Sequence, residues 1–338
     1  MRNGLQIVSV GMVTAVGLDA PSSCAAMRAR LDGFRETDFD GAGQWLTGAP
    51  VPLPKNWIGE KRLAHLASAA IIEALDQLPE AREKATLILC VPEQDRPEGG
   101  FDARSLLSRV ARIAEIDASQ SSRLVAHGRA SGHVAIRAAA EMLNAGEAEY
   151  VCVVGVDSYL NTSAINYGLR AKRLLTQHNP NGFIPGEAAA AFVCCRAGKG
   201  GLRLLGLGLA REPASIYNPS DLPLRGDGMT EAYSAALRQA GIEMKHVGYR
   251  IADLIGEQYW FKQTALANIR LLRDRHDFQD IWSPTESLGN VGAAVGPIMV
   301  GMAFVAAKKR YAAGNPVLIE ASNENGACAA AVFAGEAA

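Results

Sequence analysis

The chain has 338 residues and a formal net charge of −1, with 34 Lys and Arg against 35 Asp and Glu. This balance gives no electrostatic reason to bind nucleic acid or an anionic membrane surface. About half of the residues are apolar, as in a globular protein of two domains or one large bipartite domain. The apolar runs are short, so we expect no membrane span. The first four residues show no signal-peptide pattern, and we therefore expect a cytoplasmic protein.

In chain order, two parts of the sequence predict the same succession of elements. The first part begins with an apolar strand at residues 5–11 and the second with a similar strand at residues 202–208. Each part continues with helical segments, a buried strand, an Ala- and Gly-rich helix and two further strands. In the first part we expect helices at 20–31 and 62–78, a strand at 85–91, a helix at 130–145 and strands at 150–155 and 188–195. The matching elements of the second part are a helix at 230–240, a strand at 249–255, a helix at 291–312 and strands at 316–320 and 328–334.

This repeat predicts an α/β fold built from two duplicated βαβαβ halves, which we place at residues 1–198 and 199–338. Strands that are apolar throughout are typical of sheets covered on both faces. The alternative is that the same elements recur without duplication, as α/β proteins often reuse them. Residues 213–229 are rich in Pro, Gly, Asp and Ser, so we expect a surface loop there.

Two segments are expected to carry chemistry because each leads into a predicted helix. They are residues 126–133, which read Ala-His-Gly-Arg-Ala-Ser-Gly-His, and residues 287–294, which read Ser-Leu-Gly-Asn-Val-Gly-Ala-Ala. Ligands of α/β sheets gather at the carboxyl ends of strands and at helix N-termini. Two related halves would bring these two helix starts together near a pseudo-twofold axis.

Several segments resemble the β-ketoacyl-acyl-carrier-protein synthases of the thiolase superfamily, in order and over nearly the whole chain. They are residues 7–17 (first strand and turn), 129–132 (the turn after the nucleophile), 181–189 (Asn-Gly-Phe-Ile-Pro-Gly-Glu-Ala-Ala, close to the family's DGFxxGEGAA), 292–294 and 325–330. The resemblance implies a thiolase-like fold in α-β-α-β-α layers, with the two halves corresponding to the ketosynthase N- and C-terminal domains. It also implies an acyltransferase-type protein of fatty-acid or polyketide biosynthesis, although the chain is shorter than a typical member.

Family members form homodimers that pair through a central strand, and the resemblance suggests Tyr150–Gly155 for that role. The same segment is also compatible with a strand inside the sheet. No residue pattern decides between the two.

The same comparison replaces all three catalytic residues of the family, a Cys and two His. The Cys position falls on Arg129, the first His on Ile255, and the second His on Gly289 or, with a slip of one residue, on Asn290. A guanidinium stays protonated and cannot carry an acyl group as a thiolate does. We therefore expect a vestigial pocket and a protein that has lost condensing activity. It would bind an acyl chain or thioester, an acyl-carrier protein or another protein partner, or act as a non-catalytic subunit. Chain-length factors of the superfamily are the precedent that the resemblance offers, since they also lack the nucleophile. A secretion-system partner is a further idea that no residue supports.

Arg129 has two interpretations, because a cation at a helix start opposes the helix dipole and needs compensation. It binds an anion, or it fills the vestigial pocket and pairs with Glu257 or Glu324; we favour the second. The rival function is an active acyltransferase or malonyl-thioester decarboxylase in which Arg129, His127 and Asn290 replace the usual three residues. Glu257, at a predicted strand end, is a further polar candidate.

The remaining signals are weak. His133 is expected to pack as a histidine of the first helical turn, and Ser131 lacks the partners of a catalytic triad. No nucleotide-binding glycine motif and no Cys/His spacing for zinc is present, so we predict no cofactor and no metal. The cysteines are expected to be buried free thiols: Cys24, Cys90, Cys152, Cys194, Cys195 and Cys328.

Overall fold

The computed structural model describes residues 4–41, 43–94, 96, 102–116, 122–198, 200–273 and 279–335. Within these residues, ten strands form one continuous sheet, and β2 (Arg35–Asp40) pairs with β3 (Trp45–Gly48) in a separate antiparallel pair. The large sheet follows the order β10-β9-β11-β12-β8-β1-β7-β6-β4-β5. Its middle junction is the short antiparallel pairing of β8 with β1.

The two sides of this junction have the same strand order. The first side contains β1 (Leu5–Val13), β4 (Ala85–Cys90), β5 (Arg123–Val125), β6 (Tyr150–Ser158) and β7 (Glu187–Arg196). The second contains β8 (Leu202–Arg211), β9 (Tyr249–Ala252), β10 (Asp280–Trp282), β11 (Val317–Ser322) and β12 (Ala327–Ala334). On each side the first and last strands in chain order pair antiparallel: β1 with β7, and β8 with β12. The next pairing outward is also antiparallel, β7 with β6 and β12 with β11. The two outermost pairings are parallel, β6-β4-β5 on one side and β11-β9-β10 on the other. The predicted repetition of elements is therefore a repetition of topology.

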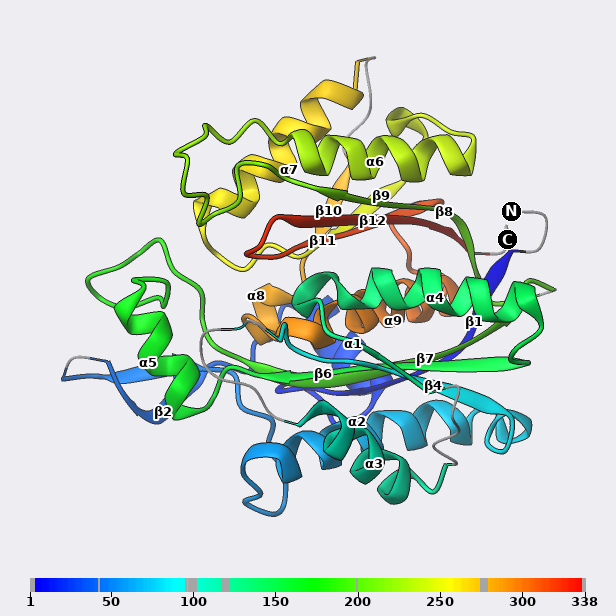
Figure 1. The fold of residues 1–338 in the computed structure, drawn as a ribbon, viewed down its shortest axis with the longest axis horizontal. Helices are drawn as coiled ribbons and strands as arrows, with labels where there is room; N and C mark the ends of the chain where they lie inside the picture. Colours follow the sequence, from blue (N-terminus) through cyan, green and yellow to red (C-terminus); the bar gives the residue numbers. More distant parts are fainter. Residues whose placement is uncertain are drawn as a thin grey trace.

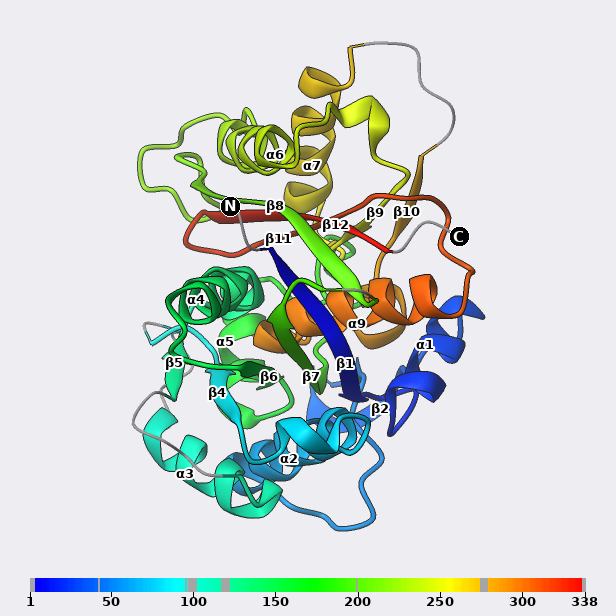
Figure 2. The same cartoon turned by 90° about the vertical axis from the view of Figure 1, so that its right-hand side faces the viewer.

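The helices complete five layers (Figures 1 and 2). In the centre, α4 (Ser131–Ala145) and α9 (Val295–Lys308) lie between the two sides of the sheet. One outer face is covered by α2 (Gly59–Asp76) and α3 (Ala103–Ala114), and the other by α6 (Asp227–Ala240) and α7 (Gln258–Leu271). This is the expected α-β-α-β-α arrangement of a thiolase-like fold. The remaining α-helices are α1 (Ala20–Arg28), α5 (Thr162–Arg170) and α8 (Thr285–Leu288).

The starts of α4 and α9 touch each other at two glycines. A Cβ atom on Gly132 would lie 2.9 Å from the Cα of Gly296, and a Cβ on Gly296 would lie 2.9 Å from the Cα of Gly132. Only glycine permits such a close approach of two backbones. The prediction that the two helix starts meet is therefore confirmed.

Three expectations need correction. Strand β6 pairs with β7 along its whole length and with β4 on its other side, so Tyr150–Gly155 is internal and the suggestion that it pairs across a dimer is wrong. The loop predicted at residues 213–229 ends earlier, because α6 already begins at Asp227 after the left-handed Gly226. Five cysteines are buried as expected, but Cys195 is only partly buried.

Candidate functional site

Arg129 lies in a 3₁₀ turn, Gly128–Ala130, immediately before α4, and its side chain is fully buried. One terminal nitrogen donates to Oδ2 of Asp253 at 2.8 Å. The Cζ atom lies 3.9 Å from the centroid of the Trp260 ring, and the second terminal nitrogen lies 3.9 Å from Oε1 of Glu324. The cation is therefore held by an ion pair and an aromatic face rather than by solvent.

Of the two carboxylates predicted to pair with Arg129, Glu257 and Glu324, only one lies near it. Glu324 is near it, as predicted, but the direct hydrogen bond comes from Asp253, and Glu257 pairs with a different arginine. Asp253 directly follows β9, and Glu324 lies in the turn between β11 and β12. Strands β9 and β11 are parallel neighbours, so their carboxyl ends bring both acids to the same edge of the sheet as the start of α4.

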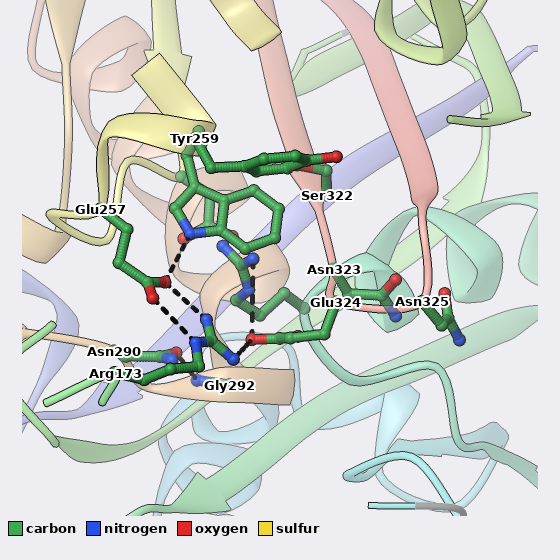
Figure 3. Close-up of polar contacts among 12 residues, drawn as sticks. Arg173, Glu257, Tyr259, Asn290, Gly292, Ser322, Asn323, Glu324 and Asn325 are labelled. Carbon is green, nitrogen blue, oxygen red and sulfur yellow. Dashed lines mark hydrogen bonds and ion pairs between the residues drawn. The ribbon is translucent and has the colours of Figure 1, made fainter. Parts of the chain in front are cut away.

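Arg173 forms a second buried ion pair that the sequence analysis missed (Figure 3). Its Nε donates to Oε1 of Glu257 at 2.8 Å, and a terminal nitrogen donates to Oε2 at 2.5 Å. The other terminal nitrogen lies 3.0 Å from Oε1 of Glu324, and the indole of Trp260 donates to Glu257 at 2.8 Å. Glu324 therefore lies between two arginines, while Trp260 contacts Arg129 with its face and Glu257 with its N–H.

A third pair lies beside these two. Arg96 donates to both carboxylate oxygens of Asp157 at 2.9 and 3.0 Å, and to the hydroxyl of Tyr159 at 2.6 Å. Its Nε lies 3.5 Å from Glu93, whose other oxygen accepts from the amide of Asn323 at 3.3 Å. The three arginines thus meet five carboxylates in one cluster.

Burial and the neighbouring charges shift the pKa values of the carboxylates in the cluster. Burial, together with the charge of Glu324, raises the pKa of Glu93 to about 7. Burial also raises the pKa of Asp253 to about 6, because the attraction of Arg129 compensates it only in part. Burial alone would raise the pKa of Glu324, but the charges of Arg129, Arg173 and Arg96 outweigh it and hold that pKa at about 2.

The other positions predicted for catalytic residues lie in the interior. Ile255 is buried in an apolar cluster that includes Phe183 and Trp260. Gly289 has a φ of +65°, and a Cβ there would lie 2.4 Å from the carbonyl oxygen of Ile184. Asn290 is fully buried; its Oδ1 accepts from the backbone of Gly292 at 3.1 Å, and in the part of the chain that the structure describes its Nδ2 has no hydrogen-bond partner.

His127 and Arg129, which the rival function uses together, lie in different environments: His127 is exposed, whereas Arg129 is buried. The main chain of His127 has the structural role: its N–H donates to Ser131, and its carbonyl accepts from the amide of Asn323 at 2.9 Å. His133 is buried as expected, and burial lowers its pKa to about 4, so it is neutral at neutral pH.

Two cavities open beside the cluster. A groove of about 1250 Å³ runs past the segment 50–63, and a smaller cavity of about 300 Å³ lies between α5 and the turn at residues 323–326. Glu93 and Arg96 line both, whereas Arg129 and Asn290 line neither. The smaller cavity therefore ends at the outer ion pairs of the cluster and does not reach the side chain of Arg129.

The comparisons with known proteins agree with this fold. A sequence model of the family described as beta-ketoacyl synthase, N-terminal domain, matches residues 123–199. The chain is similar in structure to the ishigamide ketosynthase/chain length factor (17% identity, TM-score 0.81, covering 99% of this chain and 100% of that one). It is also similar to a beta-ketoacyl synthase from Burkholderia phymatum (17% identity, TM-score 0.79, covering 99% and 100%).

A third similar structure is a ketosynthase in complex with its chain length factor from Xenorhabdus doucetiae (16% identity, TM-score 0.79, covering 99% of this chain and 98% of that one). No curated protein sequence matches the chain significantly. The chain thus resembles ketosynthases and chain length factors and has their thiolase-like fold. In the described residues, no helix has the length and apolar character needed to cross a bilayer, and no group of three or more His, Cys, Asp or Glu suits a metal ion.

Proposed function

We propose that the protein is a ketosynthase-like protein without condensing activity, which binds an acyl thioester, an acyl-carrier protein or a partner protein. The observation that carries the proposal is the burial of Arg129, which the resemblance to ketosynthases puts at the nucleophile position of the family. Condensation begins with acyl transfer to a thiolate. Here a guanidinium takes that place and is held between Asp253 and Trp260.

Arg129 stays protonated at physiological pH. Burial alone would lower the pKa of Arg129, but the charges of Asp253 and Glu324 outweigh it and raise that pKa. A cation that never deprotonates cannot act as a nucleophile. The described cysteines offer no substitute, because burial raises the pKa of each thiol; for Cys24 and Cys152 it rises to about 12.

A non-catalytic subunit is the form of this proposal that the structural relatives support. Two of the similar structures are described as containing a chain length factor, and one of these holds it in a complex with a ketosynthase. Within this proposal we include association of the chain with itself or with a related chain, and a role in fatty-acid or polyketide biosynthesis in the cytoplasm. Light scattering of the purified protein tests the first part, since a homodimer doubles the mass of 35.8 kDa.

Mass spectrometry of thioester reactions tests the loss of condensing activity. The purified protein is incubated with malonyl- and acyl-thioesters, and the products and the intact protein mass are measured. The expected result is no condensed product and no covalent acyl adduct on the chain. An adduct on any residue, or a condensed product, contradicts the proposal.

The second candidate function is decarboxylation of a malonyl thioester, which needs only donors that stabilise an enolate. One observation favours it: Nε and one terminal nitrogen of Arg129, and Nδ2 of Asn290, are buried donors without a hydrogen-bond partner in the described residues. Release of acetyl thioester that is abolished in Arg129→Lys and Asn290→Leu, but retained in the exposed control Arg203→Lys, supports this function. The absence of release in the unaltered protein excludes it.

A further inference from the structure

The small cavity has a mixed wall of aromatic rings and arginines. Its rings belong to Tyr159, Tyr167, Phe183 and Tyr217, and Ala164 and Gly168 of α5 add apolar surface. A volume of about 300 Å³ is at the lower end of the range of ligand pockets, about 300–1,000 Å³. The cavity is thus suited to a short, compact apolar group rather than to a long chain.

The charged groups at the inner end of the cavity already have partners. Arg173 is bound by Glu257 and Glu324, and Arg96 is bound by Asp157. Glu93 accepts from Asn323. A ligand gains little from groups whose hydrogen bonds are complete, so the inner end is a closed polar wall.

The rim of the cavity differs, because it carries side-chain donors for which the described residues supply no partner. Arg211 ends β8 and is exposed; its backbone is paired with Ala327 in the sheet, but its guanidinium has no hydrogen bond or ion pair among the described residues. Asn325 lies in the turn between β11 and β12; its Oδ1 accepts from Ala327, which leaves its N–H₂ group free (Figure 3). Ser215 also lines the cavity. A guanidinium with amide and hydroxyl donors is the set that a carboxylate prefers.

We propose that this cavity binds a free monocarboxylic acid with a short apolar body, its carboxylate at Arg211 and Asn325 and its body among the aromatic rings. The inference goes beyond the proposed function, because a free acid is not among the ligands named there; it rests on that proposal only in that the ligand is bound and not turned over. The carboxylate supplies the acceptors that the rim lacks. The body displaces water from the tyrosine and phenylalanine faces.

Calorimetry with three small probes tests the pairing of charge and body. Sodium benzoate carries both features, benzyl alcohol carries only the apolar body, and acetate carries only the charge. Benzoate is expected to bind saturably, and the other two about tenfold more weakly or worse. Equal affinity for benzyl alcohol, or no saturable binding of benzoate, overturns the inference.

Two variants of one strand provide the matched comparison. Arg211→Gln is expected to weaken benzoate binding about tenfold, whereas Arg203→Gln, at the opposite end of β8 and also exposed, is expected to leave it unchanged. Ser215→Phe places a ring at the rim and is expected to abolish binding while the circular dichroism spectrum stays unchanged. Equal effects of the two arginine variants contradict the proposed position of the carboxylate.

The outcome is separable from that of the proposed function. Absence of benzoate binding without thioester turnover refutes the ligand class and leaves the loss of condensing activity standing. Condensation of thioesters refutes the proposed function whatever benzoate does.

Discussion

The starts of α4 and α9 occupy equivalent places in the two parts of the fold, and both lie beside a carboxylate, but only the start of α4 has a cation in its turn, Arg129. At α9, the carboxylate of Asp157 accepts from the backbone N–H of Ala293 at 2.9 Å, and a Cβ on Gly292 would lie 1.8 Å from the same oxygen. At α4, the guanidinium of Arg129 occupies the corresponding turn. A carboxylate complements the positive end of the helix dipole, whereas a guanidinium opposes it.

The comparison shows how a fold accommodates an unfavourable charge. The start of α9 receives the carboxylate of Asp157 from β6, 136 positions away in the sequence, which accepts from the backbone N–H of Ala293 and also binds Arg96. The start of α4 depends on residues far away in the sequence, namely Asp253, Trp260 and Glu324. Both helix starts are therefore compensated only in the complete tertiary structure: at α9 a distant carboxylate meets a backbone donor, and at α4 a distant carboxylate meets the guanidinium.

Removal of the distant carboxylate tests this dependence most strongly. Asp253→Ala leaves Arg129 buried without its hydrogen-bonded counter-charge, and the free energy of unfolding is expected to fall by about 3–5 kcal/mol. Urea unfolding measures the loss. The exposed pair of Arg82 and Asp76 is the control, since Asp76→Ala is expected to cost less than about 1 kcal/mol. Similar losses in the two variants contradict the assignment of a special role to Asp253.

Replacement of both members of the buried pair sharpens the comparison. The double variant Arg129→Met with Asp253→Leu removes both charges and restores apolar volume. Its stability is expected to exceed that of Asp253→Ala by at least about 2 kcal/mol, because no unpaired charge remains. A double variant as unstable as Asp253→Ala would show that shape, and not charge, holds this helix start.

The glycine contact between the two helix starts gives a smaller effect. Gly132→Ala places a methyl group against the backbone of Gly296, and the unfolding free energy is expected to fall by about 1–3 kcal/mol. Gly241→Ala, at a glycine with open space around it, is a control for the change of residue type, although its φ of +71° adds backbone strain of about 1 kcal/mol. Thermal unfolding compares the two; a smaller loss at Gly132 than at Gly241 refutes the tight contact.

The pH dependence of stability tests the carboxylate that lies beside the start of α4, Glu93. The pKa of Glu93 is raised to about 7 from an ordinary value of 4.5, so the folded protein binds this proton more tightly than the unfolded chain does. The stabilisation from this group is complete below about pH 4.5 and is lost as the pH rises towards 7. Glu93→Gln mimics the neutral acid, and its stability relative to the unaltered protein is expected to increase from pH 5 to pH 8. A difference that is constant with pH contradicts the shift.

The sequence predicted the fold well because its signals are local. Apolar strands, Ala-rich helices and glycines at helix starts recur in both parts, and each reports on its own few residues. The family match over residues 123–199 covers the segment with the start of α4. The division at residue 198 stays a prediction. The short strands β5 and β10 and the helices α5 and α7 were not identified. Helix α3 was also missed, although its buried residues recur at helical spacing.

The site was predicted only in part. Arg129 was singled out because a cation before a helix is locally unfavourable, but its hydrogen-bonded partner was misassigned. Asp253 carried a signal that was overlooked: it is a charged residue immediately after an apolar strand. Arg173 carried none, because it lies in an irregular segment between α5 and β7.

By itself, the sequence determined the order of the elements, the two glycine-rich helix starts and the presence of a permanent cation before one of them. The tertiary structure decided which carboxylate pairs with that cation, since Asp253 lies 124 positions from Arg129 in the sequence. The same holds for the second arginine, Arg173, which pairs with Glu324 across 151 positions. Helix and strand patterns arise from neighbours along the chain, whereas a buried charge is satisfied by whichever groups the strand ends bring within hydrogen-bond distance.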